Sequence, residues 1–250
     1  MDENHIPQNH PRARSLHIRS LLTRGFNHGA VTPEGLIAHG RGEAFDYLLG
    51  ESTSSFAHEA ITAASCLFLL SDRPVISVNG NFAALCATHI SELSDVTNSL
   101  VEINLFYRTK RRENIISEIL QKNGVKRIYG LGDKTKLVKI PELHSERRNV
   151  DPDGIYKSDL VFVPLEDGDR TEALVNMKKK VITVDLNPLS RTARTANISI
   201  VDNIVRVVPT LIKITKSLKN KDKEFLRSIL NDFNNKINLD NSLKIIQGNL

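Results

Sequence analysis

A repeated pattern of buried runs and polar loops between residues 160 and 201 constrains the fold more than any other feature of this chain. Three short apolar runs occupy residues 160–164, 181–184 and 198–201, and helical spacing separates the first two. Strand, polar loop, helix, strand is typical of parallel α/β proteins. We therefore predict an α/β fold in which helices flank a mostly parallel sheet.

Polar side chains follow these runs at the points where the expected strands end. The first run leads into the acidic residues Glu166, Asp167 and Asp169, and the second leads into Asp185 and Asn187. In parallel sheets, ligands bind beyond the carboxyl ends of the strands. We therefore expect these loops to form half of an active site.

Two helix starts can be located within the same region. Asp169 and Glu172 stand three residues apart before an apolar stretch, as in a capping box, so we predict that Asp169 opens a helix. Asn203 precedes the apolar residues of the next helical pattern, which begins at Ile204. Asparagine is a favoured helix cap, and we predict that role for Asn203.

The size and composition are those of an ordinary globular protein. With 250 residues and 28.0 kDa, the chain can bury a substantial core as one domain with appendages. No apolar run approaches the ~18 residues of a membrane span, and no apolar signal segment precedes residue 15, so we expect an intracellular, cytoplasmic protein. Cys66 and Cys86 lie among apolar neighbours, which favours core packing over a disulfide or metal pair.

The net charge of +5 does not indicate a nucleic-acid partner. Eight Lys or Arg and four Asp or Glu lie between Ile212 and Leu250, so most of the excess belongs to this terminal segment. Such a segment is usually a solvated helix. The chain has no tryptophan for base stacking, and we expect neither nucleic acid nor membrane as a partner.

The N-terminal part contains an arginine between two glycines. We expect an extended arm over residues 1–14, a helix over 12–26, and a substrate-binding loop around Gly40-Arg41-Gly42. Glycines let the backbone approach a ligand, and a guanidinium binds phosphate or carboxylate with two nitrogens. The string is not a dinucleotide fingerprint, because phenylalanine stands where the third glycine should be.

Two further strand ends carry candidate ligand contacts. Residues 75–78 lead into Asn79-Gly80-Asn81 before a helix, and a helix N-terminus above a glycine can bind an anion. It can equally be a tight βα turn. Residues 101–106 lead into Arg108. The glycine-rich stretch 130–135 is not a phosphate loop, because the glycine spacing and the residue before its lysine are wrong.

These residues suit nucleotide-dependent group transfer. The chain shows neither a cysteine–histidine metal pattern nor a nucleophile elbow. It offers arginines for phosphates and carboxylates, and an acidic loop able to hold Mg²⁺ through one or two carboxylates. In such reactions, catalysis is largely positioning and charge stabilisation.

Five long strings resemble the archaeal 4-phosphopantoate–β-alanine ligases, also called phosphopantothenate synthetases. The strings are GLIAHGRGEAFDYLLGE (35–51), RPVISVNGN (73–81), VEINLFYRT (101–109), GIYKSDLVFVPLEDGDRTEALV (154–175) and VITVDLNPLSRTART (181–195). The resemblance covers residues 6 to about 215, which leaves the role of the tail beyond 216 open.

The resemblance implies a homodimeric cytoplasmic enzyme of coenzyme A synthesis with a Rossmann-like core. Such an enzyme condenses (R)-4-phosphopantoate with β-alanine, turns ATP into AMP and diphosphate, and passes through a phosphopantoyl adenylate. The residues that match the family's ATP contacts are Arg19, Arg41, Asp185, Leu186, Asn187, Arg191, Thr192, Asn203 and Ile204.

The implied reaction suggests roles for the other candidates. Arg41 and Arg191 would stabilise charge at the α-phosphate, and His39 or Glu43 would accept the amine proton. Asn79, Gly80, Asn81 and Arg108 would bind the substrate phosphate, and Asp167 or Asp169 would hold Mg²⁺. These roles are hypotheses from residue chemistry.

We divide the chain into residues 1–56 (arm, helix and glycine/arginine loop), 57–216 (Rossmann-like core) and 217–250 (a helical tail with a frayed end), all within one structural domain. The alternative function is a nucleotide-binding sensor without ligase chemistry. It would use the same arginines but would release no diphosphate.

Overall fold

The computed structural model describes residue 7 and residues 9–249. Much of the expected N-terminal arm, residues 1–6 and 8, lies outside the described residues, and the chain is already helical from Ala13. None of the described helices is long and apolar enough to cross a membrane.

A six-stranded parallel sheet forms the centre of the molecule, with strand order β3-β2-β1-β6-β7-β8. Its strands are β1 (Pro74–Val78), β2 (Leu100–Ile103), β3 (Ile128–Tyr129), β6 (Leu160–Phe162), β7 (Lys180–Val184) and β8 (Ile198–Ile200). The chain moves outward from β1 to β3, returns to β6 beside β1, and moves outward again to β8. This is the doubly wound order, and it confirms the predicted Rossmann-like α/β fold.

Alternate side chains of the central strands enter two separate cores. Val75, Val161 and Val181 are register partners and pack on one face; Ile76 and Phe162 are partners that pack on the other. The side chains of a strand point alternately to the two faces of the sheet, and both faces are buried. The apolar runs of the sequence therefore read as continuous rather than alternating.

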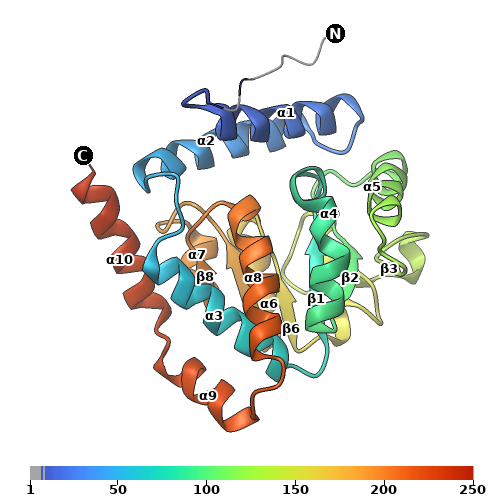
Figure 1. The fold of residues 1–250 in the computed structure, drawn as a ribbon. Helices are drawn as coiled ribbons and strands as arrows, with labels where there is room; N and C mark the ends of the chain where they lie inside the picture. Colours follow the sequence, from blue (N-terminus) through green and yellow to red (C-terminus); the bar gives the residue numbers. More distant parts are fainter. Residues whose placement is uncertain (1–6, 8, 250) are drawn as a thin grey trace.

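Helices cover both faces of this sheet. The face with Ile76 and Phe162 is covered by α3 (Ser55–Leu70), α4 (Gly80–Thr97) and α8 (Ile204–Leu218), which Figure 1 shows side by side. Beside α4 lies α5 (Lys110–Lys122). The other face packs against α6 (Gly168–Asn176), and against the antiparallel pair β4 (Val138–Lys139) and β5 (Asn149–Val150). Between β7 and β8 runs the short α7 (Arg191–Thr195).

Two N-terminal helices lie across the top of the molecule in Figure 1, beyond the carboxyl ends of the strands. They are α1 (Ala13–Asn27), which confirms the predicted first helix, and α2 (Pro33–Leu48). The expected loop at Gly40-Arg41-Gly42 is wrong, because these residues lie inside α2. The Thr32 hydroxyl caps this helix by accepting from Gly35 N, and Pro33 occupies its first turn. These start signals outweigh the low helix propensity of the glycines.

The cap of α6 lies two residues earlier than predicted. Asp167, not Asp169, has the extended backbone of a cap, and its carboxylate accepts from Arg170 N. Asp169 lies inside the first turn instead, where a negative charge favours the helix dipole. The predicted cap Asn203 is confirmed at the start of α8.

The predicted C-terminal helical tail is confirmed, but it consists of two helices rather than one. Residues after 218 form α9 (Lys223–Asp232) and α10 (Asn235–Gly248), and both pack on α3. Leu226 of α9 and Leu239 of α10 are buried. The Asn238 side chain donates to Ser199 O of β8 at 2.7 Å. The C-terminal helices therefore contribute to the core.

Candidate active site

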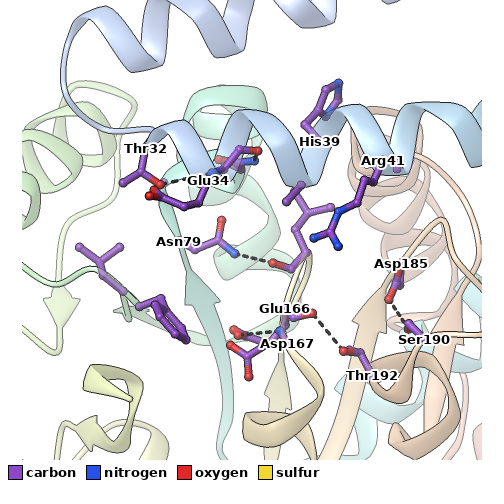
Figure 2. Close-up of a pocket in the computed structure, with 18 of the residues that line it drawn as sticks. Thr32, Glu34, His39, Arg41, Asn79, Glu166, Asp167, Asp185, Ser190 and Thr192 are labelled. Carbon is purple, nitrogen blue, oxygen red and sulfur yellow. Dashed lines mark hydrogen bonds between the residues drawn. The ribbon is translucent and has the colours of Figure 1, made fainter. Parts of the chain in front are cut away.

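A pocket of about 470 Å³ lies at the point where the strand order reverses, between the carboxyl ends of the strands and the underside of α2 (Figure 2). This is where doubly wound proteins bind ligands. The lining residues used below are Thr32, Glu34, Gly35, His39, Arg41, Gly42, Phe45, Asn79, Gly80, Asn81, Phe106, Tyr107, Arg112, Arg147, Glu166, Asp167, Asp185, Leu186, Asn187, Ser190 and Thr192.

Helix α2 is fixed over the pocket at both of its ends. Near its start, Asn81 Nδ2 donates to Gly35 O at 2.8 Å, and a side chain on Gly35 would collide with Asn81. Near its end, Asp46 accepts from Asn203 and Arg206 in a buried ion pair. The helix therefore holds Arg41 in a defined place above the strand ends.

Asn79 joins the two strands at the reversal point. Its Oδ1 caps α4 by accepting from Phe82 N, and its Nδ2 donates to Pro164 O and Leu165 O beyond β6. The side chain thus ties the end of β1 to the end of β6. Asparagine suits this position because its amide carries both a donor and an acceptor.

The floor of the pocket is a buried network of charges. Glu166 accepts from Arg170 at 2.7 Å and also pairs with Arg147, and Arg147 Nε lies 3.5 Å from Asp167 Oδ2. Burial lowers the pKa of Arg147 to about 9 and that of Arg170 to about 10. The charge of Arg170 lowers the pKa of Arg147 further. Both guanidinium groups remain protonated at neutral pH.

One end of the pocket, which we call the closed end, lies against the N-terminus of α4. Arg112 donates to Ala30 O at 2.8 Å and to Tyr107 O at 2.5 Å, which holds its guanidinium beside Gly80. A Cβ on Gly80 would lie 2.2 Å from Ala30 O and 2.9 Å from Arg112 Nη2. Only glycine permits this close approach.

The opposite end, which we call the open end, is formed by the turns after β7. Asp185 accepts from Asn187 N at 2.9 Å and from Ser190 Oγ at 2.5 Å, and burial raises the pKa of its carboxyl group. Thr192 Oγ1 donates to Glu166 O at 3.0 Å, which links this end to the floor. Arg41 reaches down toward it from α2 in Figure 2 and makes no ion pair with another described residue.

Many of the predicted site residues line this pocket together. Arg41, Asp185, Leu186, Asn187 and Thr192 lie at or near the open end, and the turn Asn79–Asn81 lies at the closed end. Asp167 lies on the floor between them.

A second group of candidates lies across α2 from the pocket centre. Glu43 binds Arg19 through two nitrogens at 2.8–3.0 Å, on the side of α2 that faces α1. His39 is one helical turn from Glu43 and about 200° around the helix from Arg41, on the upper side of α2 in Figure 2. It touches the edge of the pocket, and burial lowers its pKa.

Asn203 and Ile204, which match family ATP contacts, contact other parts of the protein in this structure. Asn203 uses its Oδ1 to cap α8 and its Nδ2 to hold Asp46. Ile204 is buried in the main core. With Arg19, these residues are not brought together with Arg41 and Asp185 in this pocket.

Two predicted arginines lie outside the pocket. Arg191 pairs with Asp169 at the surface, where 62% and 66% of their side chains are exposed. Arg108 is buried and fully engaged, since it binds Glu113 at 2.5 Å and donates to Asn149 O and Gly130 O. The guanidinium of Arg108, predicted to bind the substrate phosphate, is thus occupied by protein groups in this structure.

The two predicted Mg²⁺ ligands do not face one point. Asp167 faces the pocket, but Asp169 is paired with Arg191 outside it. No group of three or more His, Cys, Asp or Glu able to hold a metal occurs within the described residues. Only Asp167 fits as a ligand, and an ion beside it would need ligands from a bound nucleotide and water.

Sequence reasoning missed Arg112 and Arg147. Arg112 lies three residues after the cap Thr109, and the N-terminal position of α5 was a usable signal. Arg147 lies in a short 3-10 turn within the irregular stretch between β4 and β5, where no periodicity indicates which side chain turns inward.

Comparisons with known proteins find relatives over nearly the whole chain. A family model described as phosphopantothenate/pantothenate synthetase matches residues 56–249. The chain is 50% identical over 246 residues to a 4-phosphopantoate–β-alanine ligase of Thermococcus kodakarensis, covering 98% of this chain and 93% of that protein. It is 45% identical over 245 residues to the enzyme of that name from Methanosarcina mazei, covering 98% and 95%. These matches include the tail, so the expectation that the resemblance ends near residue 215 is wrong.

Proposed function

The chain belongs to the phosphopantothenate/pantothenate synthetase family, and from this premise we propose that it is an ATP-dependent ligase that joins 4-phosphopantoate to β-alanine. The observation that carries the proposal is one pocket with two different ends. The closed end has fixed cations, and the open end has polar turns beneath Arg41. An acid with a phosphate and a nucleotide need such an arrangement.

ATP fits the open end of the pocket. Asp185 and Asn187 offer oxygen and amide groups for a ribose or base, and Leu186 with Phe45 offers an apolar surface. Arg41 is the cation above this end, and it would bind the phosphates of the nucleotide. The family's match at these positions supports the assignment.

The reaction would then proceed in two steps. A carboxylate oxygen of phosphopantoate attacks the α-phosphorus of ATP, and the bond to the β-phosphate oxygen breaks, so that diphosphate leaves. The amine nitrogen of β-alanine next attacks the acyl carbon, and AMP leaves with the electron pair of the broken C–O bond. Arg41 would stabilise the charge on the α-phosphate in the first step.

Proton removal from the amine is needed in the second step. His39 has the right protonation state, because burial lowers its pKa and leaves the imidazole neutral at neutral pH. Glu43, the other predicted proton acceptor, is bound to Arg19. Arg191, which is predicted to stabilise the α-phosphate, is bound to Asp169. Either residue would have to leave its present partner before it could contact the reactants.

Mg²⁺ would enter this site with ATP. Asp167 would supply one carboxylate ligand, and the ion would neutralise negative charge on the departing diphosphate. Asp169 is the weaker of the two predicted ligands because of its pairing with Arg191.

We further propose that the protein is a cytoplasmic homodimer. Three large apolar side chains of α1 and α2 are exposed, since Phe26, Ile37 and Tyr47 are 40%, 66% and 42% exposed. Large exposed apolar residues on neighbouring elements favour a contact surface. Light scattering after gel filtration should give about twice the chain mass of 28.0 kDa, and a monomer mass would contradict the dimer.

A product assay tests the proposed function. ATP, phosphopantoate and β-alanine are combined, and each is omitted in turn. Formation of AMP, diphosphate and phosphopantothenate only in the complete mixture is the expected result. ADP with phosphate would overturn the adenylate route, and ATP binding without turnover would favour the sensor.

A further inference from the structure

The C-terminal helix α10 lies against the elements that form the open end of the pocket. Figure 1 shows it along one side of the molecule, between α9 and the end of α2, and it contacts α2, α3, α7 and β8. None of the described residues of α10 lines the pocket itself. Any part that this helix plays in the reaction must therefore pass through the elements that it holds.

A small apolar cluster joins α10 to the open end. The buried side chains of Leu239 and Ile246 pack with Leu186 of the turn after β7 and with Ala193 of α7. Phe45 of α2 packs on the same cluster, and both Phe45 and Leu186 line the pocket. This cluster is separate from the two cores of the sheet. The helix α10 thus supports the elements that carry the predicted nucleotide contacts.

Asn235, the first residue of α10, binds the end of α7 and the edge of the sheet at the same time. Its Nδ2 donates to Ala193 O at 3.2 Å and to Ala196 O at 3.1 Å. Its Oδ1 accepts from Ser199 N of β8, the edge strand, at 2.8 Å. The last carbonyls of a helix and the outer groups of an edge strand lack partners within their own element. One amide side chain satisfies groups of both kinds.

Helix α7 depends on contacts at its ends because it has only five residues. A single helical turn is unstable by itself, since nucleation costs more than its few hydrogen bonds return. At the start of α7, Ser190 Oγ accepts from Ala193 N, and at its end Asn235 binds the carbonyls. Thr192, which lines the pocket and matches a family ATP contact, lies between these two fixed points. Its position is therefore set from both sides.

We propose that Asn235 is a positioning residue for the nucleotide, which holds α7, and through α7 the side chain of Thr192, at the open end of the pocket. This assignment rests on the proposed function. It gives the C-terminal segment, whose role the sequence leaves open, a part in the binding of ATP. Because the contact reaches α7 and not the closed end, its loss should affect ATP rather than phosphopantoate.

Asn238 offers a matched control on the same helix. It lies three residues after Asn235, and its Nδ2 donates to Ser199 O at 2.7 Å. It therefore binds the same residue of β8, but none of its hydrogen bonds within the described part of the chain reaches α7. Asn238 is also the more deeply buried of the two side chains. Replacing it should destabilise the contact between α10 and β8 while leaving the end of α7 bound.

The test uses the full-length protein and the variants Asn235→Ala, Asn235→Asp and Asn238→Ala. Aspartate keeps an oxygen that can accept from Ser199 N, but it has no donor for Ala193 O and Ala196 O. ATP alone is titrated calorimetrically into each protein, and the KM of each substrate is measured with the other substrates saturating. Hydrogen exchange followed by mass spectrometry reports on the amide groups of residues 191–197. Circular dichroism melting curves measure stability.

Both Asn235 variants should bind ATP about 3- to 10-fold more weakly, as for the loss of one or two hydrogen bonds. The KM for ATP should rise by a similar factor, while kcat and the KM for phosphopantoate change by less than about twofold. Amide exchange in residues 191–197 should become about 5- to 10-fold faster in these variants. Asn238→Ala should lower the melting temperature, with ATP binding and exchange in this segment within about twofold of wild type. If Asn235→Ala does not fold, Asn235→Asp supplies the same comparison.

Failure of this inference differs from failure of the proposed function. Normal phosphopantothenate synthesis with an unchanged KM for ATP in the Asn235 variants overturns the positioning role but leaves the ligase. An equal rise of this KM in Asn238→Ala, or of both substrates' KM values in the Asn235 variants, also overturns that role. Weaker ATP binding and faster exchange of α7 in the Asn235 variants alone, in a protein that makes no phosphopantothenate, support the positioning role and overturn the ligase.

Discussion

The two ends of the pocket are built in different ways. At the closed end, Arg112 and Arg147 are held by carbonyls and carboxylates before any ligand arrives. The backbone at Gly80 lies directly against Ala30 O and the Arg112 guanidinium. At the open end, Arg41 hangs from α2 without an ion pair to another residue in the described part of the chain. The two ends therefore differ in how firmly their cations are held before a ligand arrives.

This contrast follows from where each end lies in the fold. The closed end lies against a long helix and the central strands, where burial is deep and charges must be compensated. The open end lies between a short turn and a helix that crosses above the sheet. Pre-organised groups lower the cost of binding, and adaptable groups admit a ligand that must later leave as AMP.

The largest expected effect concerns Glu102 of β2, which lies fully buried and accepts from Asp151 N and Ile155 N. Burial raises its pKa to about 7. The folded protein therefore holds this proton more tightly than the unfolded chain does. The resulting stability is complete below about pH 4.5 and is lost as pH rises through about 7, a total of about 3 kcal/mol.

Denaturant titrations from pH 4 to 8 measure this effect. In the Glu102→Gln variant, the free energy of unfolding should no longer show the decrease that this carboxyl group causes as pH rises. The exposed Glu118→Gln on α5 is the control and should retain it. Equal pH dependence in wild type and Glu102→Gln would show that Glu102 does not hold a proton in the folded protein near neutral pH.

Glycines at the two ends should respond oppositely to a methyl group. Gly80→Ala would force a contact of 2.2 Å with Ala30 O, which should cost about 1–3 kcal/mol of stability and displace Arg112. Gly42→Ala at the open end meets only Leu186 at 3.5 Å and should gain up to about 1 kcal/mol from helix propensity. Thermal unfolding of both variants measures the pair, and similar shifts would remove the distinction between rigid and adaptable ends.

Arg41→Ala should act on the nucleotide alone. Loss of this cation should raise the KM for ATP by about 10-fold or more and leave the KM for phosphopantoate nearly unchanged. Arg227→Ala on α9 is an exposed control remote from the pocket. A rise in both KM values would mean that the two ends do not bind separate substrates.

The smallest expected effect on stability is at the surface pair Arg191–Asp169. Both side chains are largely exposed, so Arg191→Ala should leave the free energy of unfolding nearly unchanged. A fall in kcat without a loss of stability would support the proposed role of Arg191 at the α-phosphate. Unchanged kcat would assign Arg191 to the surface only.

Much of the fold could be predicted from the sequence because its signals are local. The buried runs at β1, β6 and β7 and the cap Asn203 follow from apolar content and side-chain chemistry. The sequence predicts a loop at Arg41 because two glycines obscure the start signal at Thr32 and Pro33. Local propensity there opposes the capping interactions, and the capping interactions prevail.

The site was predicted where it depends on strand ends and missed where it depends on packing. Asn79, Asp185 and Asn187 follow directly from the carboxyl ends of parallel strands. Arg112 lines the pocket and Arg108 does not, because Glu113 pairs with Arg108. This pairing depends on the path of the chain in space. Arg147 enters the pocket from a segment with no periodic pattern at all.

Oxygen transfer from the acid tests the central claim most directly. Phosphopantoate labelled with ¹⁸O in its carboxylate is turned over with ATP and β-alanine, and the products are analysed by mass spectrometry. If the carboxylate attacks the α-phosphorus in this pocket, one ¹⁸O leaves in the phosphate group of AMP. Label in inorganic phosphate, or AMP formed without label, would contradict the adenylate route on which the account rests.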